Sequence, residues 1–246
     1  MKRVLACTLG LALAAGFAAA QQVKSKKEMD AYMAIQNERD PDQRIKKADD
    51  FLTKYADTTL KALVFDIMAE AAEQKGDAAH AMLYSQNALE ADPKDFQAML
   101  LISGELARGT RENDLDKDEK LGRAEKLAND AFASLKDAAK PNPKVTDEQW
   151  ENFKKDQTAQ GHVDLGMVAL ARKKVDVAIT EFKAAVDTAA TPDPVPMVRL
   201  AAAYDQANKP EEAIPVLDKV LAMPNLNPAV KQFAEGEKKR AEAKKK

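Results

Sequence analysis

Residues 62–93 read ALVFDIMAEAAEQKGDAAHAMLYSQNALEADP, and they contain two apolar stripes at helical spacing, one on each side of a glycine. Gly76 after the first stripe favours a helix end, and Asp77 suits the N-cap of the next helix. Pro93 ends the segment, because proline does not continue a helix. The stretch therefore predicts two helices joined by a tight turn. The stripes consist of Phe65, Met68, Ala69 and Ala72, then Ala81, Tyr84, Ala88 and Leu89.

The same two-helix pattern recurs at about 160–191 and at 194–224. A small residue near the start of each second helix stands at Ala81, Ala178 and Ala213. The steps between these alanines are 97 and 35 residues, and 97 is close to three repeats of about 34. The other residues in matching places are Leu165, Gly166, Ala169, Phe182 and Ala185 in the first copy, and Leu200, Ala201, Tyr204, Leu217, Val220 and Leu221 in the second.

These spacings and residue types resemble those of the tetratricopeptide repeat (TPR) family. The resemblance implies an all-α fold, a right-handed superhelix of antiparallel helix pairs that forms a TPR-like α-solenoid. Small residues let the two helices of a pair approach closely, and large apolar residues fill the space beside them. An ordinary helical bundle is the alternative, but a bundle would not need a fixed repeat period.

Weaker signals extend this array in both directions. Asp40 with Gln43, and Thr146 with Gln149, predict N-caps of two further helices. Asn227 is expected to start a final helix that caps the solenoid with a polar face. The expected additional helices cover 28–37, 44–55, 96–106, about 116–135, and 147–172 after a loop that contains Pro141 and Pro143.

One proline conflicts with the pattern. Pro215 falls in the second turn of an expected helix, where it removes one backbone hydrogen bond. The sequence therefore predicts a kink at this position.

The first twenty residues differ from the rest. Lys2 and Arg3 precede an uncharged apolar run over 4–17, and three alanines end at Ala20. This order is typical of a secretory signal peptide, and we expect cleavage before Gln21. A retained membrane anchor is the alternative, although the run is short for a bilayer. The expected organisation is a signal peptide over 1–20, a linker over 21–27 and a helical repeat domain over 28–246, with four to five helix pairs and a capping helix.

The composition argues against several classes of function. The chain has 246 residues and a net charge of -2, which argues against the basic face that nucleic-acid binding needs. Cys7, the single cysteine, lies in the apolar run, so cleavage would remove disulfides, thiol catalysis and thiolate metal sites together. No later segment is apolar enough to span a membrane.

No pattern of catalytic residues is evident. His80 and His162 lie in different repeats without a partner at ligand spacing, and no phosphate-binding loop or serine elbow occurs. We expect no catalytic residue, no cofactor and no metal site.

An acidic segment resembles a calcium loop in part. Asp114, Asp116, Asp118 and Glu125 stand at ligand positions, but Glu119 replaces the glycine that such a loop requires. We therefore favour a helix with an acidic first turn, capped by Asp114.

The end of the chain is strongly basic. A solvated, frayed terminus is the expected state, and a contact with anionic lipid or an acidic partner is the alternative. The residues concerned are Lys238, Lys239, Arg240, Lys244, Lys245 and Lys246.

The resemblance to TPR proteins implies a binding groove lined by the first helix of each pair. Some TPR proteins grip a peptide carboxylate with lysines, asparagines and an arginine. Here Asp66 and Glu70 replace a lysine and an asparagine, and Arg199 lacks its lysine companion, so we expect that clamp to be absent. The implied groove residues are Asp66, Glu70, Gln74, Gln97, Val163, Met167, Val198, Arg199, Asp205 and Gln206.

Together these features predict a non-catalytic scaffold of the bacterial cell envelope, periplasmic or secreted, which binds a protein or peptide. An assembly or chaperone-like factor that delivers clients to a membrane complex is one alternative. A calcium-regulated module or an enzyme that uses the acidic segment is a second. A pocket of convergent polar groups would favour the enzyme.

Overall fold

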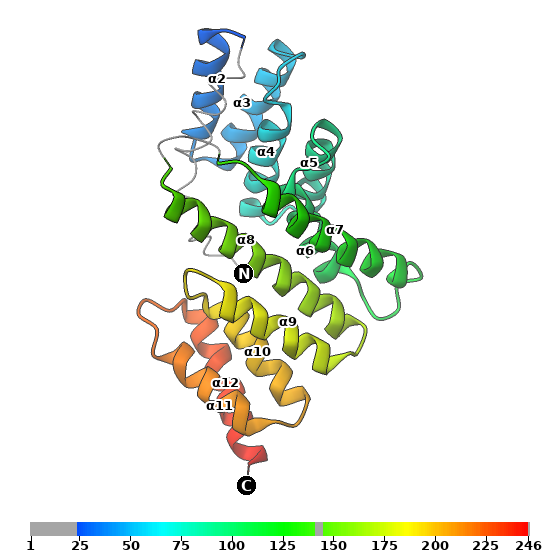
Figure 1. Cartoon of the computed structure of the whole chain (residues 1–246), viewed down its shortest axis with the longest axis vertical. Coiled ribbons are helices and arrows are strands. Elements are labelled where there is room, and N and C mark those ends of the chain that lie inside the picture. Colours follow the sequence, from blue (N-terminus) through cyan, green and yellow to red (C-terminus); the bar gives the residue numbers. More distant parts are fainter. Residues whose placement is uncertain (1–23, 141–144, 246) are drawn as a thin grey trace. The chain divides into compact units, whose positions relative to one another are not determined.

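The computed structural model describes residues 24–140 and 145–245, and this part of the chain is built from eleven α-helices without a β-strand (Figure 1). The all-α prediction is confirmed. The expected signal peptide, its cleavage site, Cys7, Pro141 and Pro143 lie outside the described residues. The helices are α2 Lys26–Gln36, α3 Pro41–Lys54, α4 Lys61–Lys75, α5 Ala78–Ala91, α6 Phe96–Gly109, α7 Lys117–Asp137, α8 Asp147–Ala171, α9 Val175–Thr188, α10 Pro194–Gln206, α11 Pro210–Leu221 and α12 Pro228–Lys244.

The helices follow one another as pairs. We call the first helix of a pair the A helix (α2, α4, α6, α8, α10) and the second the B helix (α3, α5, α7, α9, α11), and α12 follows the last pair. Each of α4 and α10 packs on its own B helix and on the B helix before it, while α12 packs on α11. The A helices α2 and α4 also touch, and α12 packs on the A helix α10 in the same way.

The described residues divide into two compact units. The first unit contains 24–105, 130–140 and 145–151, and the second contains 106–129 and 152–245. In the first unit, the rings of Tyr32 and Phe51 lie 6.4 Å apart in a core shared by α2, α3 and α4. That core contains Tyr32, Ile35, Ala48, Phe51, Leu60, Val64, Ile67 and Met68.

The core of the second unit follows the predicted repeat. Ala178 and Ala213 are fully buried, as is Ala81 in the first unit. Phe182 is also fully buried, and its ring occupies the space beside Gly166. The small and large positions of the pattern therefore pack as predicted.

Three A–B turns share one backbone geometry. Gly76, Lys173 and Asn208 have positive φ angles of 76°, 60° and 55°. The residue after each donates its N–H, over 2.9 Å, to the carbonyl five residues earlier, which satisfies a free carbonyl at the helix end. These three residues are separated by the same 97 and 35 residues as the small B-helix alanines. The turn is therefore part of the repeat, although glycine occupies it only once.

Ion pairs join successive repeats near these turns. Lys75 pairs with Asp42 in the first unit, and Lys209 Nζ lies 3.2 Å from Asp176 Oδ1 in the second. Both pairs link residues 33 positions apart, which is close to one repeat. The two carboxylates lie in the first turn of a B helix, where the helix dipole also favours negative charge.

Most of the predicted caps are present. The Asp40 side chain accepts from Gln43 N, and Thr146 with Gln149 forms the reciprocal pair of hydrogen bonds of a capping box. Asp77 accepts from His80 N and caps α5. Pro215 lies inside α11, and the helix continues to Leu221.

The prediction that Asp114 caps the helix of the acidic segment is wrong. The segment is helical, but α7 begins only at Lys117, and its first turn contains Asp118 and Glu119. Asp114 precedes the helix and accepts from Arg111 N at 3.1 Å and from Lys120 Nζ at 3.2 Å. It therefore closes the preceding turn and does not cap the helix, because the chain makes an extra turn before α7 starts.

Candidate functional site

The A helices of the first unit carry a polar cluster among the residues assigned to the groove. Glu70 Oε2 on α4 lies 3.2 Å from Arg44 Nη1 on α3, and Gln74 Nε2 donates to Glu70 Oε1 at 3.3 Å. Gln74 and Gln97 are exposed, whereas Asp66 is mostly buried. The structure thus brings Asp66, Glu70 and Gln74 together on one helix, with Gln97 at the start of α6.

Asp66 shares a hydrogen bond with Asp95, the residue just before α6. Asp95 Oδ1 also accepts from the N–H groups of Gln97 and Ala98, both at 3.0 Å. Burial raises the pKa of Asp66 well above its usual value, and the negative charges of Asp95, Asp92 and Glu70 raise it further. Burial also raises the pKa of Asp95, although its hydrogen bonds with Asp66 and the backbone oppose the rise. Asp66 is therefore the member of the pair that holds the proton.

Two further side chains from α2 complete this cluster. Tyr32 is 1% exposed, and its hydroxyl lies 2.7 Å from Gln36 Nε2. Burial raises the pKa of Tyr32, and the nearby Asp66 carboxyl raises it further. We call the set Tyr32, Gln36, Arg44, Asp66, Glu70, Asp92 and Asp95 the α4 cluster.

The groove residues assigned to the second unit separate into buried and accessible ones. Val163, Val198 and Asp205 are only 6%, 7% and 6% exposed. This corrects their assignment to an open groove, because the neighbouring helices of the array cover these positions. Met167 is partly buried against the core, Arg199 is partly exposed and Gln206 is exposed.

The basic end of the chain is ordered through Lys244, so a frayed terminus is the wrong description of residues up to that point. Lys244 Nζ lies 2.8 Å from Asp205 Oδ1 and donates to the Asp205 carbonyl at 3.0 Å. Lys238 pairs with Asp218 at 2.6 Å, and Arg240 pairs with Glu237 at 3.0 Å. The Lys244 and Lys238 contacts hold α12 on the last helix pair, whereas the Arg240–Glu237 pair lies within α12.

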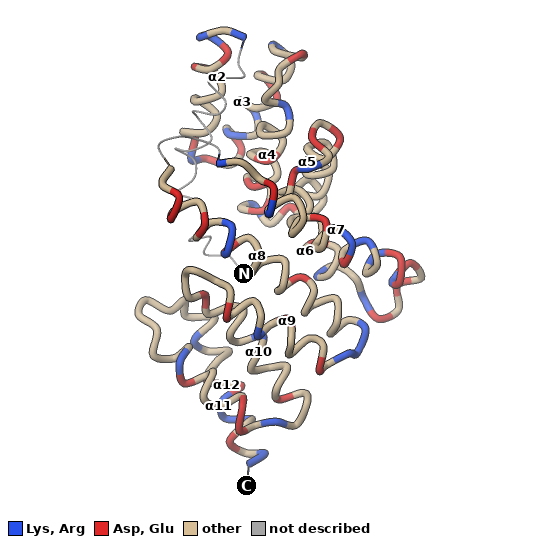
Figure 2. Tube along the Cα trace, in the orientation of Figure 1, with Lys and Arg blue, Asp and Glu red and all other residues tan. Residues whose placement is uncertain are grey.

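Figure 2 shows acidic and basic residues interspersed along the helices of each unit. A continuous basic stripe of the kind that tracks a phosphate backbone is therefore not the pattern of the described residues.

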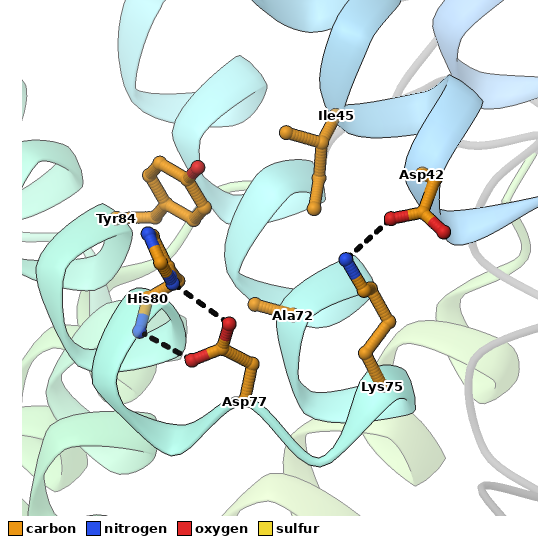
Figure 3. A pocket seen from close by; sticks show the side chains of 7 residues that line it. All are labelled: Asp42, Ile45, Ala72, Lys75, Asp77, His80 and Tyr84. Atoms are coloured by element: carbon orange, nitrogen blue, oxygen red, sulfur yellow. Dashed lines mark hydrogen bonds and ion pairs between the residues drawn. The ribbon is translucent and has the colours of Figure 1, made fainter.

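A small pocket lies between the first two repeats of the first unit (Figure 3). Its volume is about 130 Å³, and Lys75 reaches across its edge to Asp42. On the other side, Asp77 Oδ2 lies 2.7 Å from His80 Nδ1, while Asp77 Oδ1 accepts from the backbone N–H of His80. The charged groups of the pocket thus satisfy one another. Its lining consists of Asp42, Ile45, Ala72, Lys75, Asp77, His80 and Tyr84.

Both histidines have carboxylate partners, which the sequence analysis missed. His80 pairs with Asp77 three residues earlier, and this spacing was readable in the sequence. His162 Nδ1 on α8 lies 2.8 Å from Glu181 Oε2 on α9, and no local pattern could have indicated that contact.

Among residues 24–140 and 145–245, no group of three or more His, Cys, Asp and Glu side chains is arranged to hold a metal ion. Within the same residues, none of the helices combines the length and the apolarity needed to cross a membrane.

Comparison with known proteins identifies the fold. No protein-family model matches the sequence, and no curated protein matches it either. Among solved structures, the thermophilic TPR protein TTC0263 of Thermus thermophilus is similar, with a TM-score of 0.58 and 14% identity. That match covers 86% of this chain and 95% of the other. Acl4, an assembly chaperone of RpL4, has a TM-score of 0.51 and 13% identity over 91% of this chain and 98% of its own. The predicted TPR-like fold is therefore confirmed.

Proposed function

We propose that this protein is a non-catalytic interaction scaffold that binds a protein or peptide through its A helices. The TPR-like stack of helix pairs carries the proposal. Its small residues, such as Ala81, Ala178 and Ala213, are used for packing, whereas Gln74, Gln97 and Gln206 remain exposed on A helices. A surface of regularly spaced helices suits an extended partner better than a small substrate.

The same scaffold is proposed to work in the bacterial cell envelope, as a periplasmic or secreted protein. The support is the signal-peptide pattern over residues 1–20. The mature protein would then act without a cysteine, because Cys7 leaves with the signal peptide.

Site-specific photocrosslinking in the native host tests the proposal. A photoreactive amino acid is placed at Gln97 or Gln206, on A helices, or at the control positions Leu83 and Lys183, on B helices. All four side chains are exposed, so accessibility is matched. We expect discrete crosslinked partners from the A-helix positions and few from the B-helix positions. Equal crosslinking from both sets, or none from the A helices, would refute the proposal.

A further inference from the structure

The α4 cluster contains buried polar atoms for which the described part of the chain provides no hydrogen-bond partner. Two of them are acceptors, Gln36 Oε1 on α2 and Asp66 Oδ2 on α4. Tyr32 interacts with both residues, since its hydroxyl lies 2.7 Å from Gln36 Nε2 and the charge of Asp66 raises its pKa. Buried acceptors without a donor are unfavourable, so two in one cluster indicate a place for a ligand that donates hydrogen bonds.

The charged residues around Asp66 indicate the sign of the charge that the ligand carries. Arg44 on α3 is the cation of the cluster, and it pairs with Glu70 at 3.2 Å. The negative charges of Asp92 and Asp95, in the segment between α5 and α6, also act on Asp66 and raise its pKa. The described part of the first unit as a whole contains 21 Asp and Glu against 13 Lys and Arg. A cation is thus the complementary group.

We propose that the α4 cluster takes up one lysine or arginine side chain from a basic segment of a protein partner. This inference rests on the proposed scaffold function and names the chemistry of the partner. The ammonium or guanidinium donates to Asp66 Oδ2 and Gln36 Oε1, and its charge compensates the Asp66–Asp95 pair. Arg44 Nε, a buried donor that also lacks a hydrogen-bond partner in the described residues, is available to a backbone carbonyl of the same segment.

Binding of the cation changes the protonation of the cluster. Asp66 holds the proton of its hydrogen bond with Asp95 in the free protein, because burial and neighbouring acids raise its pKa. A bound cation favours the ionised carboxylate, so the proton leaves Asp66 for the buffer as the lysine or arginine enters. Affinity should therefore increase with pH, by up to about tenfold per pH unit wherever Asp66 is protonated in the free protein.

Isothermal titration of the mature protein tests this. The probes are an acetylated, amidated ten-residue peptide of alternating glycine and lysine, and the same peptide with glutamine in place of lysine. Titrations at pH 5 and pH 8, each in two buffers of different ionisation enthalpy, count the protons released. We expect the lysine peptide to bind more tightly at pH 8 with release of about one proton at pH 5. Absence of binding, or equal binding of both peptides, would overturn the inference.

The variant Asp66→Asn isolates the carboxylate. Its amide donates to Asp95 as the protonated acid does, so the fold should be retained, and circular dichroism verifies this. We expect it to lose tenfold or more of the affinity for the lysine peptide, together with the pH dependence. Asp50→Asn, on the exposed face of α3, removes the same charge elsewhere and should bind as the wild type does. Unchanged binding by Asp66→Asn would contradict the inference.

The photocrosslinking experiment separates this inference from the proposed function. If Asp66→Asn still yields the A-helix crosslinks of the wild type, the scaffold function stands and the role of the α4 cluster is refuted. If the A-helix crosslinks are lost in Asp66→Asn and kept in Asp50→Asn, both are supported.

Discussion

Gly166 on α8 lies so close to the ring of Phe182 on α9 that a Cβ atom on Gly166 would be 2.5 Å from Phe182 Cε1. Such a distance is too short for two carbon atoms. Phe182 is fully buried, so its ring has little freedom to move aside. Glycine at this position is therefore required by the approach of the two helices.

Gly166→Ala should consequently lower the free energy of unfolding by about 1–3 kcal/mol, and Gly166→Leu by more, because both overpack the α8–α9 contact. Helix propensity acts in the opposite direction by up to about 1 kcal/mol. Gly236→Ala in α12 is the control. A Cβ there meets nothing within 4 Å, so this variant should stabilise the protein through helix propensity alone. Urea unfolding of the three variants measures the difference. Stabilisation by Gly166→Ala would show that α8 and α9 are further apart.

The left-handed turn at Lys173 gives a second test. A side chain at φ 60° costs about 1–2 kcal/mol relative to glycine, so Lys173→Gly should be more stable than Lys173→Ala by about that amount. Both variants lose the exposed ion pair of Lys173 with Glu112, so this loss cancels in the comparison. If residue 173 lay inside a helix instead, Lys173→Ala would be the more stable of the two variants. Thermal unfolding decides between the two orders.

Stability should also depend on the proton of Asp66. Its pKa is raised in the folded state, so between the unfolded value of 3.8 and the raised value the folded protein binds more protons than the unfolded one. The contribution of Asp66 to stability therefore decreases as pH rises through that window. Asp66→Asn removes this decrease, so the variant should gain stability relative to the wild type from pH 4 to pH 7. A difference that stays constant over this range in urea titrations would contradict the shifted pKa.

Lys244 provides a test of the ordered C-terminal end. Lys244→Ala leaves the carboxylate of Asp205, whose side chain is 7% exposed, without its cation and should cost about 1–2 kcal/mol. The adjacent Lys245 is exposed, so Lys245→Ala should change stability by less than about 0.5 kcal/mol. Hydrogen exchange in α10 and α12 should rise in the first variant only. Equal behaviour of the two would indicate that α12 does not depend on this contact.

The export hypothesis makes a separate prediction. If residues 1–20 are a cleaved signal peptide, the mature protein begins at Gln21. N-terminal sequencing of protein purified from the native host measures this directly. Retention of Met1 would rule out cleavage and favour a membrane anchor.

The sequence was sufficient to predict features that depend only on residues close together in the chain. The turn at Gly76, the cap at Asp77 and the capping box at Thr146 are local, and each is present in the structure. The small residues at Ala178 and Ala213 were recognisable because the repeat places them at a fixed step.

The candidate site was harder to predict from the sequence, because it depends on contacts between repeats. Asp66 meets Asp95, the residue just before the next A helix, and nothing in the local sequence marks this pair. Val163 and Val198 stood at groove positions by register, but the curvature and spacing of the helices decide which groove positions are covered. Lys244 reaches Asp205 across 39 residues, a contact for which charge alone gave no register.

The shared geometry of the turns at Gly76, Lys173 and Asn208 has a consequence for building longer or shorter forms of this protein. Each turn closes its hairpin with hydrogen bonds that reach back no more than five residues. Copying one helix pair, from the start of its A helix to the end of its B helix, would thus carry a complete turn with it. The array could be extended by whole hairpins at the repeat boundary, with α12 kept as the last element.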